Sequence, residues 1–111
     1  MEKVALSKSP VEQLVKDRFK DDPIMIEIAR CESQFNQFNT DGQVLKNPTS
    51  SAKGVFQIME SIHKEPAMRL GYDILTVEGN MEYAAYLHKQ EGTKPWNSSS
   101  GCWNKTLAYN G

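Results

Sequence analysis

The chain has 111 residues, 39% of them hydrophobic, a size that suits one compact domain over residues 1–111 and argues against a second. Its 13 basic and 14 acidic side chains give a formal net charge of -1, so the charge predicts neither nucleic acid nor an anionic membrane as a partner. No apolar run is long enough to span a bilayer, and the charged residues 1–20 contain no signal-peptide core.

Two helix-start signals open the chain. Ser9 and Pro10 begin an apolar stripe at helical spacing that ends near Lys20, and Asp22-Pro23 repeats the signal. The second helix carries five residues on or beside one face, namely Ile24, Ile28, Cys31, Glu32 and Phe35. This pattern predicts that Glu32 lies on the buried side of the helix, near its C-terminus.

Residues 36–53 lose the helical periodicity and are rich in Asn, Asp, Gly, Pro, Thr and Ser, which predicts a long loop. Within it, Asp41-Gly42 is a tight-turn signal that we expect to join two very short strands. An apolar run interrupted by a single amide follows at residues 54–59.

Two further helices are predicted over residues 61–70 and 78–91, each followed by a glycine. The C-terminal segment is expected to be irregular, with Trp96 and Trp103 packed across the helices. The predicted fold class is therefore mainly α, a single helical domain with at most a very small β-hairpin.

Glu32 is the residue with the most chemical promise. A carboxylate on an apolar helical face is costly to ionise, and the carbonyl dipoles at a helix C-terminus also disfavour negative charge, so both effects should raise its pKa. A carboxyl that stays protonated near neutral pH suits glycosidic cleavage, because the leaving oxygen must receive a proton. The plainer alternative is a carboxylate that turns to water at a frayed helix end.

Three motifs occur in a fixed order along the chain. Glu32-Ser33 is followed two residues later by Phe35, the run 54–58 has the sequence Gly-Val-Phe-Gln-Ile, and Asn80 precedes the run 83–87, Tyr-Ala-Ala-Tyr-Leu. Over about residues 22–103 this order resembles the soluble lytic transglycosylase family, whose members are relatives of goose-type lysozyme. The resemblance implies a lysozyme-like α+β fold with a catalytic cleft.

The resemblance also implies an activity. In that family one glutamate, here Glu32, gives a proton to the glycosidic oxygen and then takes one from the muramic acid hydroxyl, which attacks internally. The substrate would be the peptidoglycan glycan strand, alternating N-acetylglucosamine and N-acetylmuramic acid, cut after the muramic residue. No cofactor and no metal are expected, and neither histidines nor cysteines show zinc-type spacing.

Several further residues acquire candidate roles in binding this substrate. Gln57 matches a substrate-binding glutamine whose amide suits an N-acetyl group, Ser33 could orient the acid, and Gly54 permits close backbone approach. Ordinary turn, cap and buried-amide roles compete with these. The remaining candidates for the cleft are Phe56, Tyr83, Asp41 and Tyr109, the last in a Tyr-Asn pair that matches a late family motif.

The two cysteines are open to two interpretations from the residues alone. Cys31 and Cys102 either pair, closing a long loop worth roughly 4 kcal/mol in the chain-entropy model, or stay as buried thiols. The resemblance favours a bond that braces the catalytic helix. We expect a monomer without a membrane span that is periplasmic, cell-wall associated or secreted.

Three alternatives compete with the transglycosylase. A hydrolytic lysozyme would need a second carboxylate to activate water, and Asp41 is the best candidate, although Asp-Gly is first of all a turn signal. A non-catalytic wall-binding module would grip glycan through aromatic side chains, namely Phe38, Tyr83 and Trp96. A cysteine hydrolase would pair Cys31 with His63 or His88, but no local motif supports that dyad.

Overall fold

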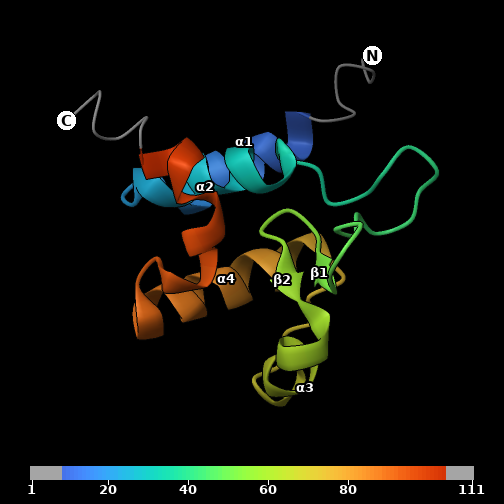
Figure 1. Ribbon diagram of the computed structural model, residues 1–111. Coiled ribbons are helices and arrows are strands. Elements are labelled where there is room, and N and C mark those ends of the chain that lie inside the picture. The colour runs from blue at the N-terminus through green and yellow to red at the C-terminus, as the bar shows by residue number, and fades with distance from the viewer. Residues whose placement is uncertain (1–8, 105–111) are drawn as a thin grey trace.

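The computed structural model describes residues 9–104 and is mainly helical, with one very small two-stranded sheet (Figure 1). The predicted fold class, mainly α with a very small hairpin, is thus confirmed. The elements in chain order are the helices α1 (Ser9–Arg18) and α2 (Pro23–Ser33), the strands β1 (Ala52–Lys53) and β2 (Ile58–Met59), the helices α3 (Glu60–Arg69) and α4 (Val77–Glu91), and the 3-10 helix η2 (Lys94–Ser99).

The helix boundaries follow the start and stop signals of the sequence. Pro23 stands at the start of α2, where its missing N–H costs nothing, and the helix is closed by Gln34, whose φ of 55° turns the chain sharply. Thr76 caps α4 by accepting a 3.0 Å hydrogen bond from the backbone N–H of Gly79. As predicted, Glu32 lies in the last turn of α2.

The small hairpin lies elsewhere than the sequence indicated. We expected Asp41-Gly42 to join two short strands, but that turn is flanked by a single bridge, between Phe38 and Val44. The antiparallel strands β1 and β2 form instead around residues 54–57. Ala52 and Ile58 are 6% and 3% exposed, so each of these strands has one side chain anchored in the interior, whereas the Asp41 turn is exposed.

Residues 94–104, expected to be irregular, are helical. η2 ends at Ser99, and residues 100–104 continue in α-helical conformation. Trp96 and Trp103 are 2% and 4% exposed, so the expected packing of both rings is confirmed. Because η2 contacts both α2 and α4, this segment ties the last part of the described chain to the helix that carries Glu32.

One hydrophobic cluster joins the described helices and strand β2. The fully buried Phe56 ring, from the turn between the strands, meets Phe19 and Trp96 edge-on at centroid distances of 5.5 and 6.1 Å. In Figure 1, α1 and α2 pack together at the top, α4 crosses below them and α3 lies at the bottom. No helix within residues 9–104 combines the length and apolarity needed to cross a membrane.

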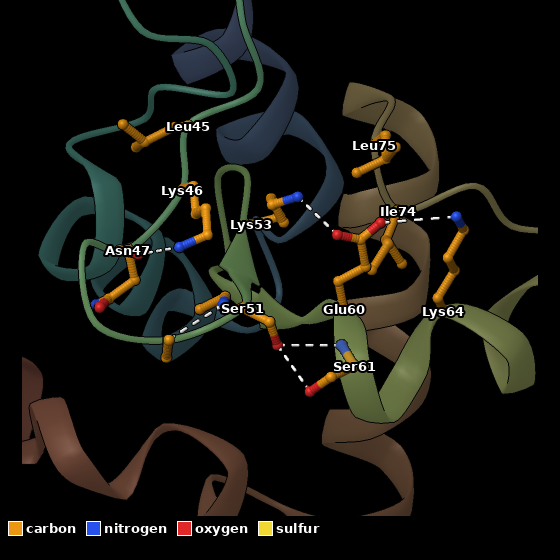
Figure 2. A network of polar contacts seen from close by, with 12 residues as sticks. Leu45, Lys46, Asn47, Ser51, Lys53, Glu60, Ser61, Lys64, Ile74 and Leu75 are labelled. Atoms are coloured by element: carbon orange, nitrogen blue, oxygen red, sulfur yellow. Dashed lines mark hydrogen bonds and ion pairs between the residues drawn. The ribbon is translucent and has the colours of Figure 1, made fainter.

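Polar contacts fasten the hairpin to α3, as Figure 2 shows. Glu60, the first residue of α3, accepts a 2.6 Å bond from the ammonium of Lys53 in β1 and lies 3.7 Å from that of Lys64. The Oγ of Ser51 accepts a 3.0 Å hydrogen bond from the backbone N–H of Ser61. The start of α3 is therefore bound to the strand that precedes the 54–57 turn.

Candidate active site

Glu32 lies one residue before the end of α2, with its side chain half-buried. One carboxylate oxygen, Oε2, accepts a 2.6 Å hydrogen bond from the hydroxyl of Ser99 in η2. Burial raises the pKa of the Glu32 carboxyl, and the hydrogen bond from Ser99 opposes part of that rise. The direction of the shift is the one that the apolar helical face predicts.

A disulfide between Cys31 and Cys102 joins α2 to the helical turn that follows η2, with the Cα atoms 6.0 Å apart. The pairing implied by the resemblance is confirmed. Since Cys31 is next to Glu32 and Cys102 comes three residues after Ser99, the bond braces the two segments that meet at the carboxyl. It also consumes both thiols of the chain, so Cys31 is not available as the nucleophile of a cysteine hydrolase.

The second motif, residues 54–58, is held against the Glu32 helix by a buried serine. Ser33 is 8% exposed, and its hydroxyl donates a 2.7 Å hydrogen bond to the carbonyl oxygen of Val55. The Oγ of Ser33 in turn accepts a 3.2 Å hydrogen bond from the backbone N–H of Asn36. Ser33 therefore forms hydrogen bonds with backbone atoms, and its role in the site is to position the 54–57 turn beside the end of α2.

Two buried amides hold the same turn from the other side. The Oε1 of Gln37 accepts a 2.9 Å hydrogen bond from the N–H of Val55, and the Oδ1 of Asn80 accepts one of 2.8 Å from the N–H of Phe56. The indole of Trp96 donates to the carbonyl of Phe56 over 2.9 Å. The three sequence motifs thus converge on one turn, which four segments of the chain fix by hydrogen bonds.

Gly54 is required by these amides. Its φ is +78°, and a Cβ at this position would overlap the Nδ2 of Asn80 and lie 2.6 Å from the Oε1 of Gln37. The sequence pointed to close approach of a sugar or of the catalytic helix. The close neighbours are instead the two amides, whose polar atoms need the space to reach the backbone.

Gln57 closes the turn in a left-handed conformation, with φ at 49°. Its Nε2 donates to the carbonyl of Gly54 over 2.9 Å and lies 3.4 Å from that of Leu45, while its Oε1 has no partner among residues 9–104. The side chain is half-buried. An orientated amide with a vacant acceptor can bind a donor such as the N–H of an N-acetyl group.

Left-handed backbone at residues other than glycine is confined, within the described chain, to the neighbourhood of the two motifs. Gln34 and Phe35 have φ of 55° and 65° directly after Glu32-Ser33, and Gln57 is the third such residue. Such conformations cost of order 1 kcal/mol or more and cluster at functional sites, where the surrounding structure enforces them. Their positions single out this region independently of the sequence motifs.

Two cavities adjoin the motif residues. One of about 370 Å³ meets the turn and η2, and one of about 580 Å³ follows the end of α2. The first is lined by Gln57, Ile58, Met59, Ile62, His63, Leu87, Glu91, Pro95 and Trp96. The second is lined by Val11, Phe35, Asn36, Gln37, Phe38, Asn39, Thr40 and Leu45. Glu32 lines neither cavity: it comes three residues before Phe35 of the second and is hydrogen-bonded to Ser99, three residues after Trp96 of the first.

The aromatic candidates are mostly part of the core. Phe56 is fully buried and Tyr83 is 2% exposed, which leaves neither ring free to contact a ligand. The hydroxyl of Tyr83 lies 2.8 Å from the Nδ1 of His63, and burial lowers the pKa of that imidazole. Of the three rings proposed for a wall-binding module, only Phe38, 46% exposed, faces solvent.

Asp41 lies in an exposed turn of the long loop. Its Oδ1 accepts a 3.0 Å hydrogen bond from the backbone N–H of Gln43, and its own N–H donates to the Oδ1 of Asn39 over 3.2 Å. These bonds are those of a turn-forming aspartate. Tyr109, the remaining candidate, lies outside the described residues, and residues 9–104 contain no cluster of three His, Cys, Asp or Glu side chains able to hold a metal ion.

Sequence reasoning did not single out Ser99 and expected only a packing role for Trp103, although Ser99 bonds to the Glu32 carboxyl and Trp103 bonds to Ser99. The indole of Trp103 donates to the Oγ of Ser99 over 3.0 Å. The usable signal was the spacing of Trp96, Ser99 and Trp103, three and four residues apart, which places all three on one helical face. The Asn, Ser and Gly residues between them have low helix propensity, so the segment was expected to be irregular.

Comparison of the chain with models of known protein families, with curated proteins and with solved structures found no match.

Proposed function

We propose that the protein is a peptidoglycan lytic transglycosylase with Glu32 as its catalytic acid and base. The substrate is the glycan strand, and the bond cleaved is the β-1,4 link between N-acetylmuramic acid and N-acetylglucosamine. The proposal rests on the motif resemblance, and one structural observation carries it furthest. Glu32 is half-buried, has a raised pKa, and is followed directly by Ser33, which together with Gln37 and Asn80 holds the turn that contains Gln57.

The reaction needs only one carboxyl. The protonated Glu32 gives its proton to the glycosidic oxygen as the C1–O bond of the muramic residue breaks, and the glucosamine unit leaves with a free hydroxyl. The resulting carboxylate then takes the proton of the muramic C6 hydroxyl, whose oxygen bonds to C1. Bonds and protons balance without water, and the product end is 1,6-anhydro-N-acetylmuramic acid.

The electrostatics of Glu32 support both steps. A pKa raised by burial keeps a share of the carboxyl protonated nearer to neutral pH, as the first step requires. The Ser99 hydrogen bond stabilises the carboxylate that the second step requires. Gln57 is placed to hold an N-acetyl group through its vacant Oε1.

The disulfide supports a location outside the reducing cytosol. A bond between Cys31 and Cys102 is favoured in an oxidising compartment, which agrees with a periplasmic, wall-associated or secreted enzyme acting on peptidoglycan. The protein is proposed to act as a monomer, and because its net charge is near zero, attraction to the wall comes from sugar contacts or from another domain.

The decisive experiment digests purified sacculi and identifies the product ends by mass spectrometry. Anhydromuramic ends are expected from the wild-type chain and from the control Glu65→Gln, whose side chain is exposed on α3. None are expected from Glu32→Gln. Reducing ends would replace the proposal by hydrolysis, with Asp41→Asn as the next variant, and intact glycan that remains bound to the protein would replace it by a binding module.

A further inference from the structure

The Oγ of Ser99 has three polar neighbours. It lies 2.6 Å from the Oε2 of Glu32, 3.1 Å from the carbonyl oxygen of Trp96, and 3.0 Å from the indole nitrogen of Trp103. A hydroxyl has one hydrogen to donate and two lone pairs to accept with. The two acceptors among these neighbours, the Glu32 carboxylate and the Trp96 carbonyl, therefore compete for one hydrogen.

The partners decide where that hydrogen points. An indole N–H only donates, so Trp103 occupies one lone pair of the Ser99 oxygen. The same indole N–H is shared with the Trp96 carbonyl, 3.2 Å away, in a three-centre bond, so that carbonyl has a donor without the serine. The carboxylate is the nearer and stronger acceptor, so the Ser99 hydrogen is directed to the Oε2 of Glu32.

This arrangement makes the two oxygens of Glu32 unequal. Oε2 already accepts a hydrogen bond, which disfavours a proton on it, while Oε1 has no partner among residues 9–104. We propose that Ser99, oriented by Trp103, is a positioning residue that confines the transferable proton of Glu32 to Oε1. The inference deepens the proposed function and rests on it for its catalytic meaning.

The positioning serves both proton transfers. The proton leaves Oε1 for the glycosidic oxygen, and the proton of the muramic hydroxyl returns to Oε1. The Ser99 hydroxyl donates to Oε2 throughout, and its bond strengthens when the carboxyl becomes charged. No heavy atom has to move between the two steps, and the Cys31–Cys102 bond keeps the serine in reach of the carboxyl.

The test follows Glu32 itself by titrating its side-chain carboxyl with carbon-13 NMR, using Glu32→Gln for assignment. Ser99→Ala is expected to raise the pKa of Glu32 above the wild-type value, because the carboxylate loses its donor while burial remains. Ser99→Thr keeps the hydroxyl and restores the titration. Ser98→Ala, at an exposed serine one residue earlier, leaves it unchanged.

Kinetics with soluble glycan strands provide the second measurement. Ser99→Ala is expected to lose at least about tenfold in kcat with KM unchanged, because the serine acts through Glu32 and touches no substrate. In the pH profile of Ser99→Ala, the decline of activity on the alkaline side also moves to higher pH. Trp103→Phe keeps the Ser99 hydroxyl but removes the donor that orients it, so smaller changes in kcat and in the pH profile are expected. This variant replaces Ser99→Ala should the latter not fold.

The outcomes separate this inference from the proposed function. If Ser99→Ala titrates like Ser98→Ala, or if its Glu32 pKa falls because water enters, the positioning role is overturned even when the wild type cleaves glycan. If the wild type cleaves nothing but Ser99→Ala raises the Glu32 pKa, the proposed function fails and the assignment of the hydrogen bond stands.

Discussion

The side-chain nitrogen of Asn80 occupies the space where residue 54 would carry a Cβ if it were not glycine. From there Asn80 donates to the carbonyls of Lys53 and Ile74 over 2.9 and 2.8 Å, while its Oδ1 receives the N–H of Phe56. The amide is fully buried, so each of these bonds replaces one to water. The shape of the turn beside Glu32 therefore depends on a side chain from α4.

Gly54→Ala should destabilise the protein by about 3 kcal/mol or more, because the new Cβ displaces two buried amides and the φ of +78° is unfavourable. Gly42→Ala is the matched control, since its φ is +88° but nothing lies within 4 Å of the added carbon. It should cost only about 1–2 kcal/mol. Urea unfolding measures both. Equal losses would show that backbone conformation alone requires the glycine.

Much of the fold was accessible from the sequence because its signals are local. Pro23 and the apolar stripes specify where helices begin and which faces are buried. The burial that raises the pKa of Glu32 follows from the same periodicity. Two of the aromatics considered for wall binding, Tyr83 and Trp96, are buried, as large rings often are in a core.

Contacts between distant segments could not be predicted in this way. The partners of Ser33 and Ser99 are 22 and 67 residues away in the chain, and no local pattern encodes such pairs. The position of the hairpin depended on burial of Ala52 and Ile58, which tertiary packing decides. The resemblance supplied the Cys31–Cys102 pairing that spacing alone left open.

Removing the Cys31–Cys102 bond should lower the free energy of unfolding by about 2–4 kcal/mol, because it releases a loop whose ends are 71 residues apart. The double variant Cys31→Ala/Cys102→Ala, compared with the wild type in guanidinium, measures this. Thiol labelling of the unreduced, denatured wild type should find no free cysteine. Two labelled thiols would remove the brace from the site.

The ion pair of Lys53 with Glu60 should contribute about 0.2–1 kcal/mol, since both side chains are partly exposed, at 18% and 23%, and water screens them. The ammonium of Lys53 lowers the pKa of Glu60. A lowered folded-state pKa gives stability that is present above the ordinary glutamate pKa and is lost as the pH falls through the folded value.

A double-mutant cycle with Lys53→Met and Glu60→Gln, repeated between pH 2 and 7, measures that coupling and should show it vanish in acid. High salt should also weaken it. The pair Glu65 with Arg69, 3.9 Å apart and with the carboxylate side chain 84% exposed, is the control and should give little coupling at any pH. A coupling for Lys53 and Glu60 that persists in acid would contradict an ionic origin.

Glu32→Gln should make the protein more stable at neutral pH while it abolishes activity. Because burial raises the folded-state pKa of Glu32, its favourable contribution is present below the ordinary glutamate pKa and is lost as the pH rises through the folded value. Glutamine removes that loss and can still accept from Ser99. Its gain in Tm over the wild type, a few degrees at about pH 7, should therefore shrink toward pH 4.

Circular dichroism melts of wild type, Glu32→Gln and the exposed control Glu65→Gln across that range make the comparison. The control should show no comparable trend. A glutamate retained as a helix-end contact would give the opposite result. Its replacement would lower Tm, and the loss of Tm would grow with pH, because the ionised form would then be the stabilising one. If the charged carboxyl lowers the stability of the protein, and its replacement nevertheless abolishes glycan cleavage, then Glu32 is retained for its chemistry.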